Sequence, residues 1–170
     1  MNSAGLLVDA FGRIREVVHE AVEGLADEEL AARVDPDANS VAWLVWHLTR
    51  VQDDHLADAF GMDQVWTSDG WADRFGLPFP KGATGYGQTR AQVAAVRAPA
   101  ALLLGYHDAV HARTEELVRG VTNADLDRVV DTRWDPPVTL GVRLMSVIAD
   151  DLQHAGQAAY ARGVVERRGG

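Results

Sequence analysis

The feature that most limits the fold of this chain is a helical period of apolar residues that recurs in each of its long segments. In residues 3–24, apolar side chains return at steps of three and four positions, and polar side chains fill the positions between them. Residues 40–60, 100–118 and 140–162 repeat the pattern, and no strand-like alternation of useful length occurs. The sequence therefore predicts an all-α protein with these four long helices.

Local signals set the helix boundaries. Ser40 is an N-cap residue for the second helix, and Thr139 can cap the last one. Pro99 predicts a kink or restart in the helical region that begins at Thr89. Gly163 is expected to end the last helix, which leaves residues 163–170 as a frayed tail. With 170 residues, the chain is long enough for a single domain with a sizeable core.

Residues 61–88 form a long connection between the second and third helices. Glycines and prolines interrupt it repeatedly, yet it contains aromatic residues that a disordered linker would lack. A connection of this length inside a domain is usually functional. We expect an ordered flap with a short helix near residues 71–75, which either roofs a pocket or covers the core.

An acidic pair interrupts the apolar side of the last helix. That side is predicted to consist of seven residues: Leu144, Val147, Ile148, Leu152, Ala155, Ala159 and Tyr160. Asp150 and Asp151 lie within this run, and since adjacent helical residues face different directions, one of the two is expected to turn inward. Burying an unpaired carboxylate is costly, and a metal or a cationic partner would offset that cost.

The candidate functional residues are those that can bind a divalent metal. Asp150 and His154 are four residues apart, so a helix places a carboxylate and an imidazole one turn apart on one face. His47 lies within another strongly apolar segment, residues 41–48. Two histidines and one carboxylate would form a metal site with positions left for water and substrate. Asp54 and Gln157 are candidates for a second shell or a substrate contact.

The other four histidines offer alternatives or lie elsewhere. His107 and His111 have the same four-residue spacing and form the rival pair, although their polar neighbours favour a structural or surface role. His55 is either a partner of the metal site or a surface group. His19 falls among polar positions and is expected at the surface.

The overall charge and the absence of cysteine exclude several classes of function. The net charge is −9 and no basic cluster stands out, which argues against nucleic acid and anionic membranes as partners. No apolar run is long enough to cross a bilayer, and the N-terminus does not read as a signal peptide, so a cytoplasmic location is expected. With zero cysteines, any metal must bind nitrogen and oxygen. A homodimer stays an open candidate for the oligomeric state.

Three stretches of the chain resemble the DinB-like metalloprotein superfamily, and the resemblance covers nearly the whole chain. They are residues 39–48, residues 106–114 and residues 154–157. More narrowly, the chain is similar to the branch with mycothiol-dependent transferases and maleylpyruvate isomerase. The resemblance implies an up-down-down-up four-helix bundle and a divalent metal, often zinc or nickel. Its ligands would be His47, Asp150 and His154, although related proteins have histidine or glutamate where Asp150 stands here.

Function hypotheses of different classes follow from this resemblance. The first is an enzyme in which the metal activates a low-molecular-weight thiol such as mycothiol for transfer to a small electrophile, or for its isomerisation. The absence of protein cysteine fits an enzyme that uses an external thiol. The second is a non-catalytic, stress-related bundle that binds a metal or ligand. A metal-activated hydrolase is a third hypothesis. None of these assigns a catalytic residue.

Overall fold

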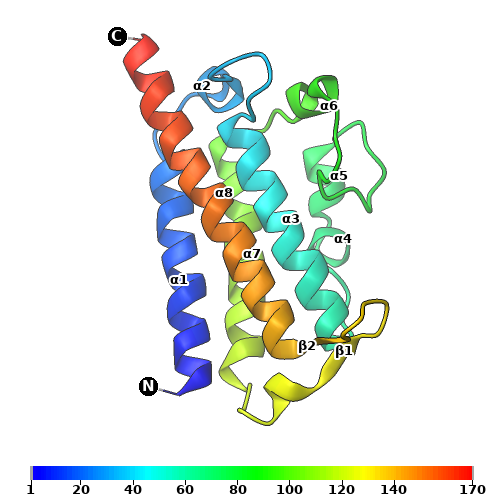
Figure 1. Ribbon diagram of the computed structural model, residues 1–170. Coiled ribbons are helices and arrows are strands. Elements are labelled where there is room, and N and C mark those ends of the chain that lie inside the picture. Colours follow the sequence, from blue (N-terminus) through cyan, green and yellow to red (C-terminus); the bar gives the residue numbers. More distant parts are fainter. Residues whose placement is uncertain (1, 170) are drawn as a thin grey trace.

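The computed structural model describes residues 2–169, which form a bundle of four long helices (Figure 1). These helices are α1 (Ser3–Val22), α3 (Val41–Phe60), α7 (Ala100–Arg119) and α8 (Leu140–Gly169). α1 and α8 run upward in Figure 1, whereas α3 and α7 run downward. The predicted all-α fold and its up-down-down-up path are therefore confirmed, with parallel α3 and α7 joined by the long connection.

Short elements link the long helices. The helical ones are α2 (Asp27–Ala31), α4 (Val65–Ser68), α5 (Trp71–Phe75), α6 (Arg90–Ala95) and the 3₁₀ helix η1 (Asp125–Asp127). Strands β1 (Val129–Asp131) and β2 (Val138–Thr139) form a small antiparallel pair before α8. The sequence pattern did not predict this pair, because two or three residues are too few to show a period of two.

The predicted helix starts are confirmed by their capping geometry. The Ser40 hydroxyl accepts a hydrogen bond from the Trp43 backbone N–H, which satisfies one free donor of α3. α7 begins at Ala100, directly after Pro99, so the helical region restarts at the proline as expected. The Thr139 hydroxyl accepts from the Val142 N–H in the first turn of α8.

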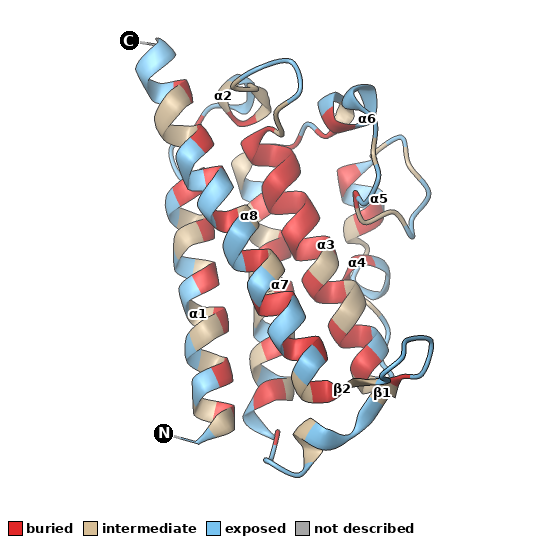
Figure 2. Ribbon diagram, viewed as in Figure 1, coloured by how far each residue is buried: buried red, intermediate tan, exposed pale blue. Residues whose placement is uncertain are grey.

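The buried faces of the helices turn toward a common core, and α3 is buried along most of its length (Figure 2). α3 packs against α8 and α7, and residues 61–88 cover much of its remaining face. Its polar residues are therefore enclosed as well, including Arg50 and Asp53. A buried polar group needs a hydrogen-bond partner. Arg50 and Asp53 find partners in residues 61–88, and these bonds hold the connection against α3.

α8 buries four of the seven residues predicted for its apolar side, Leu144, Val147, Ile148 and Ala155, and differs from the prediction at the other three. Leu152 and Tyr160, assigned to the apolar side, are 46% and 70% exposed, and Ala159 is exposed too. Small residues take the buried positions, notably Ala155, Ala158 and Ala161. Small side chains let two helices approach closely, and α8 packs along α1 as well as α3. The apolar pattern alone therefore assigned Leu152, Ala159 and Tyr160 to the wrong face of the helix.

The predicted end of α8 at Gly163 is wrong, because the helix continues to Gly169. Contacts to other elements support this extension. Val165 is buried, and the Arg162 guanidinium donates to the backbone oxygens of Glu20 and Glu23 at the end of α1. These contacts outweigh the low helix propensity of glycine. Of the tail expected to fray, Gly170 lies outside the described residues.

In residues 2–169, no helix combines the length and apolar character that a membrane span requires.

Candidate metal centre

The structure brings His47, Asp150 and His154 together in the groove between α3 and α8. One potential ligand atom from each residue lies within 4.8 Å of the others, and the two imidazole rings meet edge to face at 4.8 Å. Among residues 2–169 this is the one group of three or more such side chains close enough to bind a metal. His47 is about a hundred residues from the other two, so the antiparallel contact of α3 and α8 creates the cluster.

The position of His47 is fixed from three sides. Its ring stacks on Trp43 at 4.6 Å, and the Trp43 indole N–H donates to the Gln88 side chain at 2.7 Å. Its Nδ1 lies 2.5 Å from the Thr84 carbonyl oxygen. A carbonyl oxygen can only accept, so Nδ1 carries the proton and Nε2 keeps a free lone pair. Burial lowers the pKa of His47 and outweighs the opposite effect of its hydrogen bond to the Thr84 carbonyl oxygen, which favours the neutral ring that a metal requires.

Gly85 closes the third side of His47. Its φ is +99°, and a Cβ built there would lie 2.8 Å from His47 Nδ1 and 3.1 Å from the rings of Trp43 and Trp46. Both the backbone conformation and the close approach require glycine at this position. The connection therefore contributes directly to the cluster through two adjacent residues, Thr84 and Gly85. Neither residue stands out in the sequence, because glycines and small polar residues are frequent throughout this connection.

The α8 side of the cluster follows the predicted spacing. His154 Nε2 lies 3.6 Å from Asp150 Oδ1, and His154 Nδ1 lies 3.0 Å from the Gln157 amide oxygen. That oxygen accepts the Nδ1 proton, so His154 also presents the lone pair of Nε2. Gln157, a candidate for a second shell, thus contacts the cluster by accepting a hydrogen bond from His154. Gln157 and Thr84 thus select the same tautomer in the two histidines.

These residues fit a divalent metal. Two neutral imidazole nitrogens and a carboxylate are a common donor set for zinc and other divalent first-row metals. Asp150 Oδ2 is buried and has no hydrogen-bond partner within residues 2–169, and no arginine or lysine there forms an ion pair with it. An unpartnered carboxylate oxygen beside two imidazole lone pairs is the arrangement that a cation would stabilise. The Asp side chain, one methylene shorter than Glu, already reaches the cluster.

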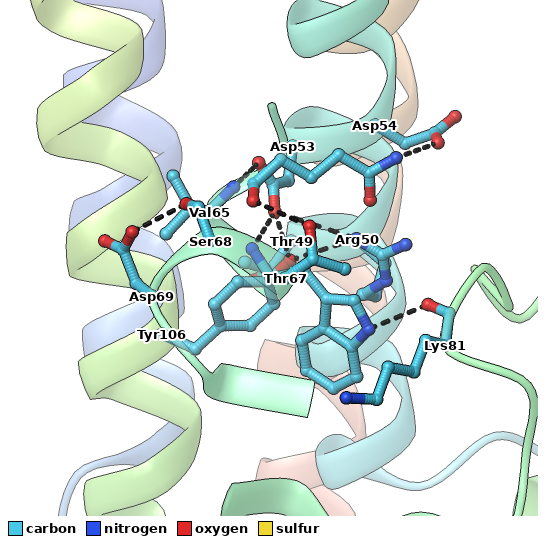
Figure 3. Close-up of polar contacts among 12 residues, drawn as sticks. Thr49, Arg50, Asp53, Asp54, Val65, Thr67, Ser68, Asp69, Lys81 and Tyr106 are labelled. Carbon is cyan, nitrogen blue, oxygen red and sulfur yellow. Dashed lines mark hydrogen bonds and ion pairs between the residues drawn. The ribbon is translucent and has the colours of Figure 1, made fainter. Parts of the chain in front are cut away.

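A buried polar network holds the connection that carries Thr84 and Gly85 (Figure 3). Asp53 accepts hydrogen bonds from the backbone N–H groups of Val65 and Trp66 at the start of α4, and from the Tyr106 hydroxyl. The Arg50 guanidinium lies 3.6 Å from Asp53 and donates to the Ala83 carbonyl oxygen, one residue before Thr84. Arg50 and Asp53 therefore link the fold of the connection to the position of His47.

The connection is ordered, as predicted, and its helix α5 falls at residues 71–75. Its aromatic residues pack on the bundle, with Trp66, Trp71 and Phe75 all within 6 Å of the Tyr106 ring centre. It covers the core between α3 and α7 and lines a cavity of about 220 Å³ there. None of its residues lines either of the two cavities beside the metal cluster, so it supports His47 and does not roof the groove.

Asp54 and His55 lie outside the cluster. Asp54 accepts a hydrogen bond from Gln64 at 2.7 Å, and no hydrogen bond or ion pair in the described part of the chain links it to the three candidate ligands. His55 Nδ1 lies 2.6 Å from the Arg143 guanidinium. Burial, followed by the charge of Arg143, lowers the pKa of His55 and favours its neutral form. The structure therefore places Asp54 at the connection and His55 in the wall of a neighbouring cavity.

The rival pair, His107 and His111, lies apart from the cluster of His47, Asp150 and His154. His107 is fully buried and its Nδ1 lies 3.1 Å from the Thr49 hydroxyl. His107 and His111 have ring centres 6.5 Å apart, and they form no group with a third potential ligand among residues 2–169. His19, expected at the surface, is partly buried and lies 2.9 Å from both Glu23 and Asp108.

Asp151 is the member of the acidic pair that turns fully inward. Its side chain has no exposed surface, and neither carboxylate oxygen has a partner within the described residues. Burial, with a smaller contribution from Asp150, raises the pKa of Asp151 well above its ordinary value. The expected inward turn is confirmed, but the inward residue is Asp151, whereas Asp150 is half-exposed at the cluster.

Comparisons with known proteins agree with this architecture. The sequence profile of the Mycothiol-S-transferase family matches residues 6–167. A solved structure described as the conserved protein of locus from Enterococcus faecalis has 32% sequence identity and a TM-score of 0.90. The match covers 97% of this chain and 98% of that chain. No curated protein matches the chain. The resemblance to mycothiol-dependent transferases is thereby confirmed, and the chain belongs to the Mycothiol-S-transferase family of DinB-like proteins.

Proposed function

We propose that this protein transfers the sulfur of a low-molecular-weight thiol of the mycothiol type to a small electrophile, at a divalent metal bound by His47, Asp150 and His154. The observation that carries the proposal is the convergence of these donors within 4.8 Å in an open groove. Membership of the Mycothiol-S-transferase family supports the thiol, and the absence of cysteine leaves the nucleophilic sulfur to an external molecule.

The reaction forms one carbon–sulfur bond. The thiol sulfur attacks the electrophilic carbon, the leaving group departs with its bonding electron pair, and the thiol proton passes to the solvent. A divalent metal held by these residues would lower the pKa of a bound thiol and so favour its deprotonation at neutral pH. His47 and His154 provide neutral nitrogen donors, and Asp150 brings one negative charge. Thr84 and Gln157 keep both rings in the tautomer that presents Nε2.

Cobalt substitution tests this proposal. We expect His47→Ala and His154→Ala each to abolish stoichiometric cobalt binding at neutral pH, because a site with three protein ligands loses one. Asp150→Asn should weaken binding less, since an amide oxygen still offers a lone pair without the charge. Mycothiol added to the cobalt-loaded wild type should produce a sulfur-to-cobalt charge-transfer band. Titration followed by absorption spectroscopy measures both effects.

The double variant His107→Ala/His111→Ala is the matched control. We expect it to keep most or all of the wild-type cobalt occupancy, and to keep the thiol-dependent band. Full cobalt occupancy in His47→Ala/His154→Ala would show that the metal lies elsewhere. A charge-transfer band without any thiol transfer would favour the non-catalytic binding protein. Turnover of an ester or amide without thiol would favour the hydrolase.

A further inference from the structure

Two cavities flank the metal cluster along the groove between α3 and α8. One, which we call the Trp134 cavity, has a volume of about 300 Å³ and is lined by His55, Trp134, Val138, Val142, Val147 and Asp150, among others. The other, the Tyr160 cavity, has a volume of about 540 Å³ and is lined by Asn39, Leu152, Gln153, Gln157 and Tyr160, among others. Both volumes are within or close to the range of small-molecule sites.

Helical spacing makes both cavities continuous with the cluster. On α3, Val51 and His55 follow His47 at successive steps of four residues, so they extend along the same face. On α8, Val147 precedes Asp150 by three residues, and Asp150 itself lines the Trp134 cavity. On the opposite side, Gln157 lines the Tyr160 cavity and bonds to His154. A ligand in either cavity is therefore adjacent to the cluster.

The Trp134 cavity combines largely apolar walls with a hydrogen-bond donor on His55. A guanidinium can only donate, so the contact from Arg143 requires His55 Nδ1 to accept and places the proton of the neutral ring on Nε2. That N–H has no hydrogen-bond partner within residues 2–169. The charge of Arg143 is already paired with Asp131 at 2.9 Å. The cavity thus suits a small neutral molecule, apolar or aromatic, that carries one hydrogen-bond acceptor.

The Tyr160 cavity has a different chemistry. None of its lining side chains is charged, and three of them, Asn39, Gln153 and Gln157, are amides. Amide groups both donate and accept, which matches the hydroxyl groups of a sugar or another polyol. The Tyr160 ring, 70% exposed at the edge, adds a flat apolar surface. Mycothiol is a thiol with a neutral, polyhydroxylated body, and this larger cavity has the volume and the amides to bind it.

We infer that the two cavities divide the substrates on either side of the metal. The Tyr160 cavity binds the polyhydroxylated part of the thiol. The Trp134 cavity binds the electrophile, a small neutral aromatic or apolar molecule whose acceptor group receives a hydrogen bond from His55 Nε2. This assignment rests on the proposed function for the identity of the thiol, but binding in the Trp134 cavity can be tested without turnover.

Two matched substitutions on α8 separate the cavities. Val142 lines the Trp134 cavity and Leu152 lines the Tyr160 cavity, and both side chains are about half exposed. A tryptophan at either position should therefore fill one cavity without disturbing the packing of the core. Val142→Trp should weaken nitrobenzene binding to the metal-free protein at least tenfold by calorimetry, and leave the mycothiol-dependent cobalt band within twofold. Leu152→Trp should weaken the mycothiol response at least tenfold and leave nitrobenzene binding within twofold.

The hydrogen bond from His55 is tested with two ligands of similar size. Wild type should bind nitrobenzene, which has an acceptor, several-fold more tightly than toluene, which has none. His55→Leu should remove this preference and leave toluene binding unchanged. The division of substrates would be overturned if Val142→Trp weakened the mycothiol response and Leu152→Trp weakened nitrobenzene binding. It would also be overturned if Val142→Trp did not weaken nitrobenzene binding. Absence of thiol transfer with intact nitrobenzene binding in the Trp134 cavity would overturn the proposed function and the thiol half of the division, and leave the aromatic site standing.

Discussion

At the scale of single residues, His107 shows how this core accommodates an imidazole. The Thr49 hydroxyl has one proton and donates it to the Val45 carbonyl oxygen at 2.7 Å. His107 Nδ1 must therefore donate to Thr49, which leaves the lone pair of Nε2 buried and without a partner among residues 2–169. Protonating Nε2 would place a charge in the core. Burial, followed by the charge of His111, lowers the pKa of His107 to about 3.

This shift predicts a loss of stability in acid. The unfolded chain binds a proton at His107 near pH 6.5, whereas the folded protein does not until about pH 3, so stability falls as the pH drops through this window. The slope from this one group is about 1.4 kcal/mol per pH unit, or about 2 kcal/mol between pH 6.5 and 5. His107→Asn, which keeps a donor but cannot titrate, should lose this component in urea unfolding of metal-free protein.

His19 provides a control of opposite sign. Burial alone would lower its pKa, but hydrogen bonds to Glu23 and Asp108 outweigh that effect and raise it. Protonated His19 therefore stabilises the folded protein in acid, and this contribution is lost as the pH rises through the raised pKa of His19. His19→Gln should cost more stability at pH 5 than at pH 8. An acid slope in His107→Asn equal to that of wild type would contradict the neutral buried ring.

At the scale of elements, the connection from residue 61 to residue 88 depends on Asp53. This carboxylate accepts two backbone N–H groups of α4 and balances the fully buried Arg50. Removing one partner of a buried ion pair typically costs about 3–5 kcal/mol, because the other charge stays unpaired. Asp53→Ala should therefore destabilise the protein by an amount in this range, measured by chemical denaturation. It should also lower cobalt occupancy, since Thr84 and Gly85 would no longer hold His47.

Asp54→Ala is the matched control for that experiment. Asp54 is the next residue on α3 and also bonds to the connection, through Gln64, but it is partly exposed. We expect it to change stability by about 0.5 kcal/mol or less, as is usual for surface positions. Limited proteolysis should cut residues 61–88 faster in Asp53→Ala than in Asp54→Ala. Equal stability and equal cleavage of the two variants would show that the buried ion pair does not hold the connection.

At the scale of the whole molecule, the metal cluster lies at the edge of the core, with His47 packed against the core residue Trp43. The buried apolar residues form one cluster that involves all four long helices, whereas His154 and Asp150 lie at its edge in the groove. We therefore expect metal removal to leave the bundle folded. Dialysis against a chelator should preserve the helical circular dichroism spectrum and a cooperative thermal transition. Restored metal at 100 times its dissociation constant should add about 2.7 kcal/mol. A metal-free protein without helical structure would instead assign the metal a structural role.

The sequence by itself determined the four long helices, the capping residues Ser40 and Thr139, and the four-residue spacing of Asp150 and His154. These are local properties, since a period of 3.6 residues, a capping hydroxyl and a four-residue spacing all act within a few turns of one helix. The position of His47 in an apolar segment made it the candidate third ligand, and the DinB-like motifs supported that choice and implied the up-down-down-up path of the helices. Thus the fold and the three candidate ligands could be predicted before any contact between helices was known.

The tertiary structure alone decided which face of α8 is buried and what surrounds the ligands. Adjacent residues on a helix differ by about 100° in direction, so close packing of the alanines against neighbouring helices turned Asp151 inward and Leu152 outward. Thr84, Gly85 and the ion pair of Arg50 with Asp53 act on His47 across tens of residues. Such contacts depend on how helices and loops meet in space, and no local period in the sequence encodes them.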